Sequence, residues 1–259
     1  GVVMIGGISL EIFNVTSDPV QVFQRRAGYA TNFGCVAPYS AISTKNGVVW
    51  IGKDDDGQGS VYRLQGGIPT EISTIAVVET LQQAGANLVN ATAFTYQQSG
   101  HTFYVLNIPG SDTSMVYDFD EKEWHERRSF KDINYNDWSR YRAENHMAIF
   151  GMNIVGSYDS GDLYVLDINY FKDNDLLVRR VRTMTPVYDE EGSAYGEFSC
   201  FGIDCIVGEG LTNAPHDDPK ISLSTSDDNG IHFGYERFKA LGKRGNRNQQ
   251  VIWNRCGYS

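Results

Sequence analysis

The sequence predicts an all-β protein, and we expect a β-propeller, or part of one, with four-stranded blades and one short helical insertion. Tyr, Phe and Gly are abundant (15, 13 and 27 of 259 residues), whereas long amphipathic helical windows are nearly absent. Short β-branched and aromatic runs alternate with acid- and glycine-rich turns. Groups of such runs recur roughly every 45 to 55 residues, the period expected for propeller blades. The competing architecture is a β-sandwich, whose strands normally follow at a spacing of about 8 to 12 residues.

Hairpins are expected throughout the first 65 residues. Residues 2–13 form two runs around the Gly6-Gly7 pair, and paired glycines accept the mirror-image turns of tight hairpins. Further strands are expected at residues 19–26 and 40–44. Asn46–Leu64 is a hairpin around an acidic, glycine-containing loop, because Asp bonds its own backbone and Gly takes positive φ without steric cost.

One helix is predicted, at Ile72–Gly85. Ser73 is suited to the N-cap, and Gly85 is suited to ending the helix. Apolar residues fall at helical spacing at Ile75, Val78 and Leu81, so we expect this face to pack on a sheet.

Strands resume after the helix, joined by turns such as Asp118–Lys122, Asp159–Gly161 and Ser226–Gly230. We expect them at residues 91–97, 102–108, 115–118, 123–128, 146–152, 153–158, 162–168, 176–188, 199–207, 221–225, 233–240 and 249–255. We treat residues 1–259 as a single propeller domain and as a fragment of a longer chain, because Gly1 and Ser259 both look like cut ends.

The charge balance disfavours nucleic-acid binding as the main activity. The chain has 32 acidic and 22 basic residues and a net charge of −10, whereas phosphate binding needs an excess of Lys and Arg. No apolar run approaches the ~20 residues that span a bilayer, so no membrane partner is expected. The four cysteines are too scattered for a disulfide framework, and we expect them to be reduced core residues: Cys35, Cys200, Cys205 and Cys256.

The segment Ser226-x-Asp228-x-Gly230-x-x-Phe233 matches the Asp-box pattern of propeller blade hairpins. Ser and Asp side chains bond turn amides in such a box, Gly takes positive φ, and the aromatic ring covers the blade face. The box is a folding device and carries no catalytic role.

No set of residues in the sequence predicts a catalytic site, a cofactor or a metal. The histidines lack metal-ligand spacing, and nucleophile and phosphate-loop motifs are missing. Asp54, Asp56, Gln58 and Gly59 match the start of a calcium loop only in part, because Gln65 stands at its twelfth position, so an acid-rich turn is favoured.

Paired arginines such as Arg25-Arg26 and Arg127-Arg128 are best explained by surface ion pairs, because neighbouring residues of a strand point to opposite faces. The sharper hypothesis is a subunit contact. In it, some of these arginines, together with Lys243, Arg244 and Arg247 of the GKRGNRN loop, meet acidic patches of a neighbouring subunit.

Four stretches together resemble the packaged-DNA stabilisation proteins, also called tail accessory or hub proteins, of short-tailed bacteriophages. They are GCVAPYS (34–40), NGVVWIGKDDDGQGSVYR (46–63), ISTIAVVET (72–80), and STSDDNGIHFG with GKRGNRNQQVIW (within 224–253).

The resemblance implies a non-enzymatic virion protein of the tail, assembled in the host cytoplasm. Copies would form a ring beneath the portal, extend the DNA channel and retain packaged DNA until ejection. The implied partners are copies of the chain, the portal or head-to-tail adaptor, and tail needle or spike proteins, while double-stranded DNA passes nearby without specific binding. Two other hypotheses remain: a sialidase-like or glycan-binding propeller that acts on host surface carbohydrate, and a cellular propeller that scaffolds partners.

Overall fold

The structure is a computed structural model that describes residues 1–53, 59–132, 137–184, 197–210, 212, 217–228 and 230–258. Contacts divide the chain into two compact units, Gly1–Arg179 and Arg180–Ser259. We describe each unit by itself, and the combination of residues 1–259 into one propeller domain stays a prediction.

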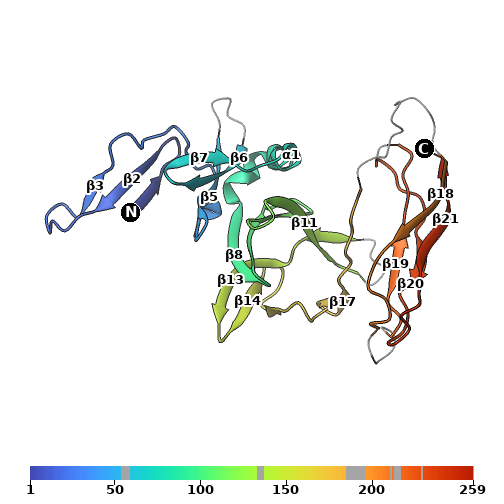
Figure 1. Cartoon of the computed structure of the whole chain (residues 1–259). Coiled ribbons are helices and arrows are strands. Elements are labelled where there is room, and N and C mark those ends of the chain that lie inside the picture. The colour runs from blue at the N-terminus through green and yellow to red at the C-terminus, as the bar shows by residue number, and fades with distance from the viewer. Residues whose placement is uncertain are drawn as a thin grey trace. The chain divides into compact units, whose positions relative to one another are not determined.

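In the described part of the first unit, four antiparallel sheets have three or more strands, and the strands of each sheet are neighbours in chain order (Figure 1). The first sheet is β1 (Val2–Ile5), β2 (Leu10–Val15) and β3 (Phe23–Arg25), and the second is β4 (Ile42–Thr44), β5 (Gly47–Lys53), β6 (Gly59–Gln65) and β7 (Ile68–Glu71). The third is β8 (Thr92–Gln98), β9 (His101–Asn107), β10 (Ser114–Asp118), β11 (Glu123–Phe130) and β12 (Trp138–Arg140), and the fourth is β13 (Ala143–Ile149), β14 (Met152–Ser157) and β15 (Leu163–Leu166). The short hairpin β16 (Lys172–Asp173) and β17 (Leu176–Leu177) follows.

Three apolar cores lie between consecutive sheets. The first and second sheets share a core of Leu10, Ile12, Trp50, Tyr62 and Leu64. The second and third share a larger one that includes Val49, Ile51, Val61, Tyr104 and Leu106. The third and fourth share a core of Phe94, Tyr96, Val105, Val116, Ala143 and Val155. Sheets of meandering strands stacked face to face in chain order are propeller blades, so the all-β propeller prediction is confirmed for this unit. The expectation of four strands in each blade holds only for the second sheet, because the described strands of the other three number three or five.

Strand alternation explains how one strand serves two cores. In β5, Val49 and Ile51 point to the core shared with the third sheet, while Trp50 between them points to the core shared with the first sheet. All three side chains are completely buried. A strand buried on both faces needs a continuous apolar run, which is what VVWI provides.

The helix α1 spans Ile75–Ala84 and packs on β6. Its N-cap is Thr74, and the expectation of Ser73 at this position is wrong, because the Ser73 hydroxyl donates to Glu71 and accepts the Val61 amide. The buried face is Val77 and Leu81, whereas Ile75 is 80% exposed. Gly85 ends the helix with φ of 53° as predicted.

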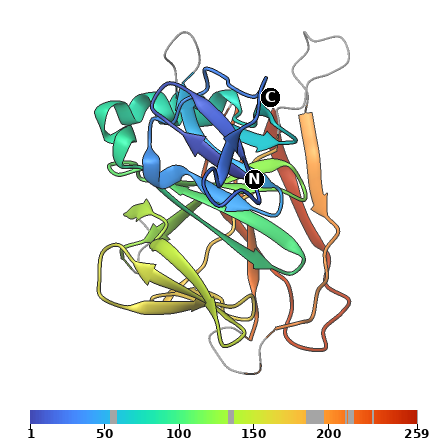
Figure 2. The ribbon, with the colours of Figure 1, turned by 90° about the vertical axis from the view of Figure 1, so that its left-hand side faces the viewer.

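The outer face of the fourth sheet is apolar and open among the described residues. Met147, Ile154 and Val165 are cross-strand neighbours on it, as are Ile149 and Met152, and Leu163 is paired with Gly156. Leu163 is 73% exposed and Met147 is 62% exposed. Figure 2 shows this sheet, in yellow-green, and the first sheet, in blue, at opposite ends of the first unit.

The described residues of the second unit form two pairs of strands: β18 (Glu197–Ile203) with β21 (Val251–Tyr258), and β19 (Lys220–Leu223) with β20 (Arg237–Ala240). Trp253 joins the pairs, because its buried indole donates from Nε1 to the Arg237 carbonyl at 2.7 Å. The Arg237 guanidinium returns two hydrogen bonds to the carbonyls of Asn254 and Arg255, each at 3.0 Å.

Two further expectations fail in the part of the chain that the structure describes. The strand expected over residues 176–188 is limited to Leu176–Leu177, and residues 178–184 form no strand where the two units meet in the chain. The four cysteines are free thiols, but Cys200 is exposed and the other three are half-buried, so the prediction of core positions is wrong.

Candidate functional site

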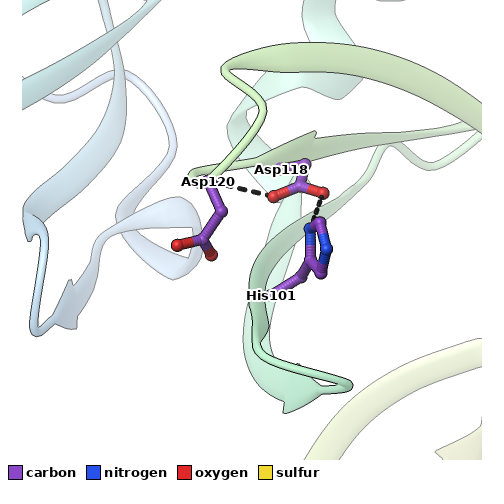
Figure 3. A group of neighbouring side chains, drawn as sticks. All are labelled: His101, Asp118 and Asp120. Carbon is purple, nitrogen blue, oxygen red and sulfur yellow. Dashed lines mark hydrogen bonds and ion pairs between the residues drawn. The ribbon is translucent and has the colours of Figure 1, made fainter.

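His101, Asp118 and Asp120 form a group at the turn between β10 and β11 (Figure 3). His101 Nδ1 lies 2.7 Å from Asp118 Oδ2, and one ligand atom from each of the three residues lies within 4.8 Å of the others. Asp118 Oδ1 accepts the amides of Asp120 at 2.9 Å and Glu121 at 3.4 Å. Asp120 Oδ2 accepts the Thr102 amide at 2.8 Å.

The electrostatics of this group follow from its hydrogen bonds. The hydrogen bond and the charge of Asp118 raise the pKa of His101. Partial burial opposes ionisation of Asp118, but the turn amides and His101 outweigh it and lower the pKa of that carboxyl. Three of the four carboxylate oxygens already accept hydrogen bonds from backbone amides or contact His101, so the arrangement fixes the β10–β11 turn against β9. The sequence predicted the turn but not the role of His101, whose partner lies on another strand.

The Asp-box-like turn has the hydrogen bonds that its sequence suggests. Ser226 Oγ accepts the Gly230 amide at 2.9 Å and donates to Asp228 Oδ1 at 2.7 Å. The His232 amide donates to Asp228 Oδ1 at 2.8 Å, and this bond, with those from Ser226 and the His232 ring, lowers the pKa of Asp228 to about 2. Gly230 has φ of 85°. Phe233 is 52% exposed, so the ring covers little, and the turn remains a local folding element.

The three basic residues of the GKRGNRN loop have different surroundings. Lys243 Nζ lies 2.8 Å from Asp217 Oδ2, which raises the pKa of Lys243 and lowers that of Asp217. Arg244 and Arg247 are exposed, and their side chains contact no acidic group within ion-pair distance in the described part of the chain. Both line a cavity of about 500 Å³, which we call the arginine pocket.

The arginine pocket lies where the loop after β18 meets the loop between β20 and β21. Its other described lining residues are Gly208, Glu209, Gly210, Thr212 and Gly245. The subunit contact that we expected at Lys243, Arg244 and Arg247 stays a prediction.

Arg127 and Arg128 point to opposite faces of β11, as strand geometry requires. The Arg127 guanidinium lies 5.2 Å from the centroid of the Phe103 ring and 5.6 Å from that of Tyr141. Arg128 Nη2 donates to Glu126 at 2.7 Å. The exposed Arg25 pairs with Glu11 at 2.8 Å. These contacts are mainly structural.

Sequence reasoning missed two buried arginines, Arg140 and Arg142. Arg140 Nη2 donates to Glu144 at 2.5 Å, and its guanidinium stacks on Tyr158 at 3.8 Å from the ring centroid. Arg142 binds Asp159 of the turn after β14. Charged residues between two strands look the same in a sequence whether they are buried or exposed, so no local pattern identified these two arginines as buried.

The acid-rich turn that we weighed as a calcium site, with Asp54, Asp56 and Gln58, lies outside the described residues.

No helix among the described residues is long and apolar enough to cross a membrane.

Comparisons with known families cover both units. One family model, described as bacteriophage P22 Gp10, beta-propeller, matches residues 1–170, and another, described as bacteriophage P22 Gp10, beta-sandwich, matches residues 180–259. The boundary between them coincides with the division of contacts at Arg179 and Arg180. No curated protein matches the chain. Because the first match alone covers more than half of the sequence, the chain belongs to the bacteriophage P22 Gp10 family of phage structural proteins that stabilise packaged DNA.

Proposed function

We propose that this protein assembles in several copies as a ring beneath the portal of a short-tailed phage, extends the DNA channel and retains packaged DNA until ejection. Membership of the Gp10 family over both units supports this role. The proposed role is mechanical and involves no enzymatic step, cofactor or metal.

The observation that carries the proposal is the open apolar face of the fourth sheet. Met147, Met152, Leu163 and Val165 are each more than 40% exposed on one side of a sheet whose other side is packed. Exposed apolar faces of this kind mark interaction surfaces, because water contact with them is unfavourable. In the proposed ring, this face is covered by a neighbouring copy.

The matching surface on the neighbour is the outer face of the first sheet. Val15 and Phe23 are cross-strand neighbours there and are 61% and 48% exposed. Inside the unit, each core joins the facing sides of two different sheets. A contact between the fourth sheet of one copy and the first sheet of the next continues that pattern. Such a contact uses two different surfaces, and copies joined in this way form a ring when the rotation closes.

The acidic balance suits a protein beside moving DNA. A net charge of −10 provides no excess of cations to hold phosphates, so DNA slides past without sticking. The proposed partners are the portal or head-to-tail adaptor on one side and the tail needle or spike on the other.

The test uses phage particles and the isolated connector. We expect the protein to add to portal complexes as a symmetric ring, visible by cryo-electron microscopy, and particles without it to lose their DNA after packaging. Particles that lack the protein and keep their genomes would contradict the sealing role. Turnover of a fluorogenic glycoside, abolished by a single carboxylate substitution, would contradict the non-enzymatic role and favour the carbohydrate-active alternative.

A further inference from the structure

We propose that the arginine pocket of the second unit binds carboxylate side chains of an acidic protein segment. The inference goes beyond the sealing role, because every described lining residue of the pocket belongs to the second unit, while the apolar face belongs to the first. An experiment that contradicts binding at the pocket therefore leaves the sealing role untouched, and the reverse also holds.

The pocket walls are fixed to each other by the backbone. The Gly208 amide donates to the Leu241 carbonyl at 2.9 Å, and the Gly245 amide donates to the Gly208 carbonyl at 2.9 Å. The Asp218 carboxylate accepts the Gly242 amide at 3.1 Å. Two loops that lie far apart in the sequence are thereby held at a fixed separation, and the pocket is formed before any ligand arrives.

The glycines allow this close approach. A Cβ on Gly208 would lie 2.6 Å from the Asn246 carbonyl oxygen, and one on Gly210 would lie 2.0 Å from that of Asp217. Both contacts are shorter than van der Waals distance and involve backbone, so a side chain at either position would push the loops apart. Gly208 also has φ of 76°, which favours glycine.

The charge of the pocket is unbalanced on the side of Arg244 and Arg247. Lys243 is neutralised by Asp217 at 2.8 Å, which leaves the two arginines without an acidic partner among the described residues. Guanidinium groups bind carboxylates and phosphates through paired hydrogen bonds, so the two arginines favour an oxyanion from outside.

Glu209 selects among oxyanion ligands. The Glu209 carboxylate in the lining can only accept hydrogen bonds, so a ligand that carries N–H donors beside its anionic groups fits better than a phosphodiester chain, whose charged oxygens are all acceptors. A peptide brings both carboxylates for the arginines and backbone N–H groups for Glu209. None of the described lining residues is aromatic, so the flat face of a sugar has no ring to stack on. These features favour an acidic peptide.

The experiment measures binding of a fluorescein-labelled peptide with three consecutive glutamates by fluorescence anisotropy. We expect the R244Q/R247Q variant to bind it about tenfold or more weakly, as for the loss of a charge-assisted hydrogen bond. The matched control is K172Q/K220Q, which removes the same charge at two exposed lysines outside the pocket and leaves binding within about twofold. Thermal unfolding of each variant verifies that the fold is kept.

Three comparisons complete the test. The same peptide with glutamines in place of glutamates should not bind. Equal binding by the wild-type chain and R244Q/R247Q, or no binding by either, would overturn the proposal. Arginine-dependent binding of duplex DNA or sialyllactose that is tighter than that of the peptide would also overturn it. Sedimentation of the chain alone identifies the source of the carboxylates: weaker self-association of R244Q/R247Q indicates a second copy, and unchanged self-association indicates another virion protein.

Discussion

The guanidinium of Arg142 donates from Nη1 to both carboxylate oxygens of Asp159, at 3.1 and 2.8 Å. Arg142 precedes β13, and Asp159 follows β14, so the contact joins the two ends of the first hairpin of the fourth sheet. The Arg142 amide also donates to the Ser129 hydroxyl at 3.1 Å, and that hydroxyl donates to Asp173 at 2.6 Å. One residue therefore ties the fourth sheet to β11 of the third sheet and to β16.

Replacement of Arg142 with methionine should destabilise the first unit by about 2 kcal/mol, because it removes the buried cation that pairs with Asp159 and Asp173, whose side chains are 37% and 27% exposed and keep part of their hydration. Chemical denaturation measures the change. The control is Arg25→Met, whose ion pair with Glu11 is exposed and should contribute less than about 1 kcal/mol. Equal losses for the two variants would contradict a structural role specific to Arg142.

Leu163→Glu should weaken self-association of the assembled protein about tenfold or more, because a charge would be buried in an apolar contact. Ile75→Glu is the matched control, since Ile75 is 80% exposed on α1, away from the fourth sheet. Sedimentation at several concentrations distinguishes the two. If Leu163→Glu and Ile75→Glu associate alike, the outer face of the fourth sheet is not the contact.

Tyr104→Phe should cost about 1 to 3 kcal/mol, because the buried hydroxyl donates to the Ser40 carbonyl at 2.9 Å and its removal leaves a buried acceptor with one bond fewer. Tyr39→Phe, at the residue before Ser40, should have almost no effect on stability because Tyr39 is 72% exposed. The comparison uses urea unfolding midpoints at equal slope. Burial of Tyr104 also raises the pKa of its phenol, so its ionisation should be missing from the spectroscopic titration of the folded protein.

The pair formed by His101 and Asp118 should make stability depend on pH at both ends of its range. The pKa of His101 is raised, so its contribution is complete below the ordinary value of 6.5 and is lost as pH rises through the folded pKa. The pKa of Asp118 is lowered, so its contribution is complete above the ordinary value of 3.8 and is lost as pH falls through the folded pKa. The pair therefore stabilises most between these two values.

Nuclear magnetic resonance titration of the His101 ring checks this prediction. The wild-type ring should titrate above 6.5, and Asp118→Asn should move it downward, because the hydrogen bond and the charge are the causes of the shift. A His101 ring that titrates identically in both proteins would contradict the contact in Figure 3.

Local patterns in the sequence predicted local structure well. The hairpin Asn46–Leu64 corresponds to β5 and β6, because continuous apolar runs identify strands that are buried on both faces. Short edge strands were missed: β7 contains Pro69 and β12 has only three residues, so neither carries a clear alternation. In α1, the buried position in the first turn was assigned to Ile75 instead of Val77, because both residues are apolar and only packing on β6 distinguishes them, whereas Leu81 is buried as expected.

In the candidate sites too, contacts within one turn could be predicted from the sequence, whereas contacts between distant segments could not. The contacts of Ser226 and Asp228 lie within one turn and follow from residue type, so the sequence suggested them correctly. In the described part of the chain, Lys243 forms an ion pair whereas Arg244 and Arg247 do not, and this difference depends on the position of Asp217, which lies on a different loop. The buried positions of Arg140 and Arg142 also depend on contacts between sheets, which no single stretch of sequence records.

The succession of three cores between consecutive sheets has a consequence for synthesis of the protein. Each sheet packs on the one made just before it, so a nascent chain can bury an apolar face as soon as the next sheet leaves the ribosome, without waiting for distant segments. Folding in this order exposes one unfinished face at a time. The last face to remain open in the first unit is that of β13 to β15, which only another surface can cover.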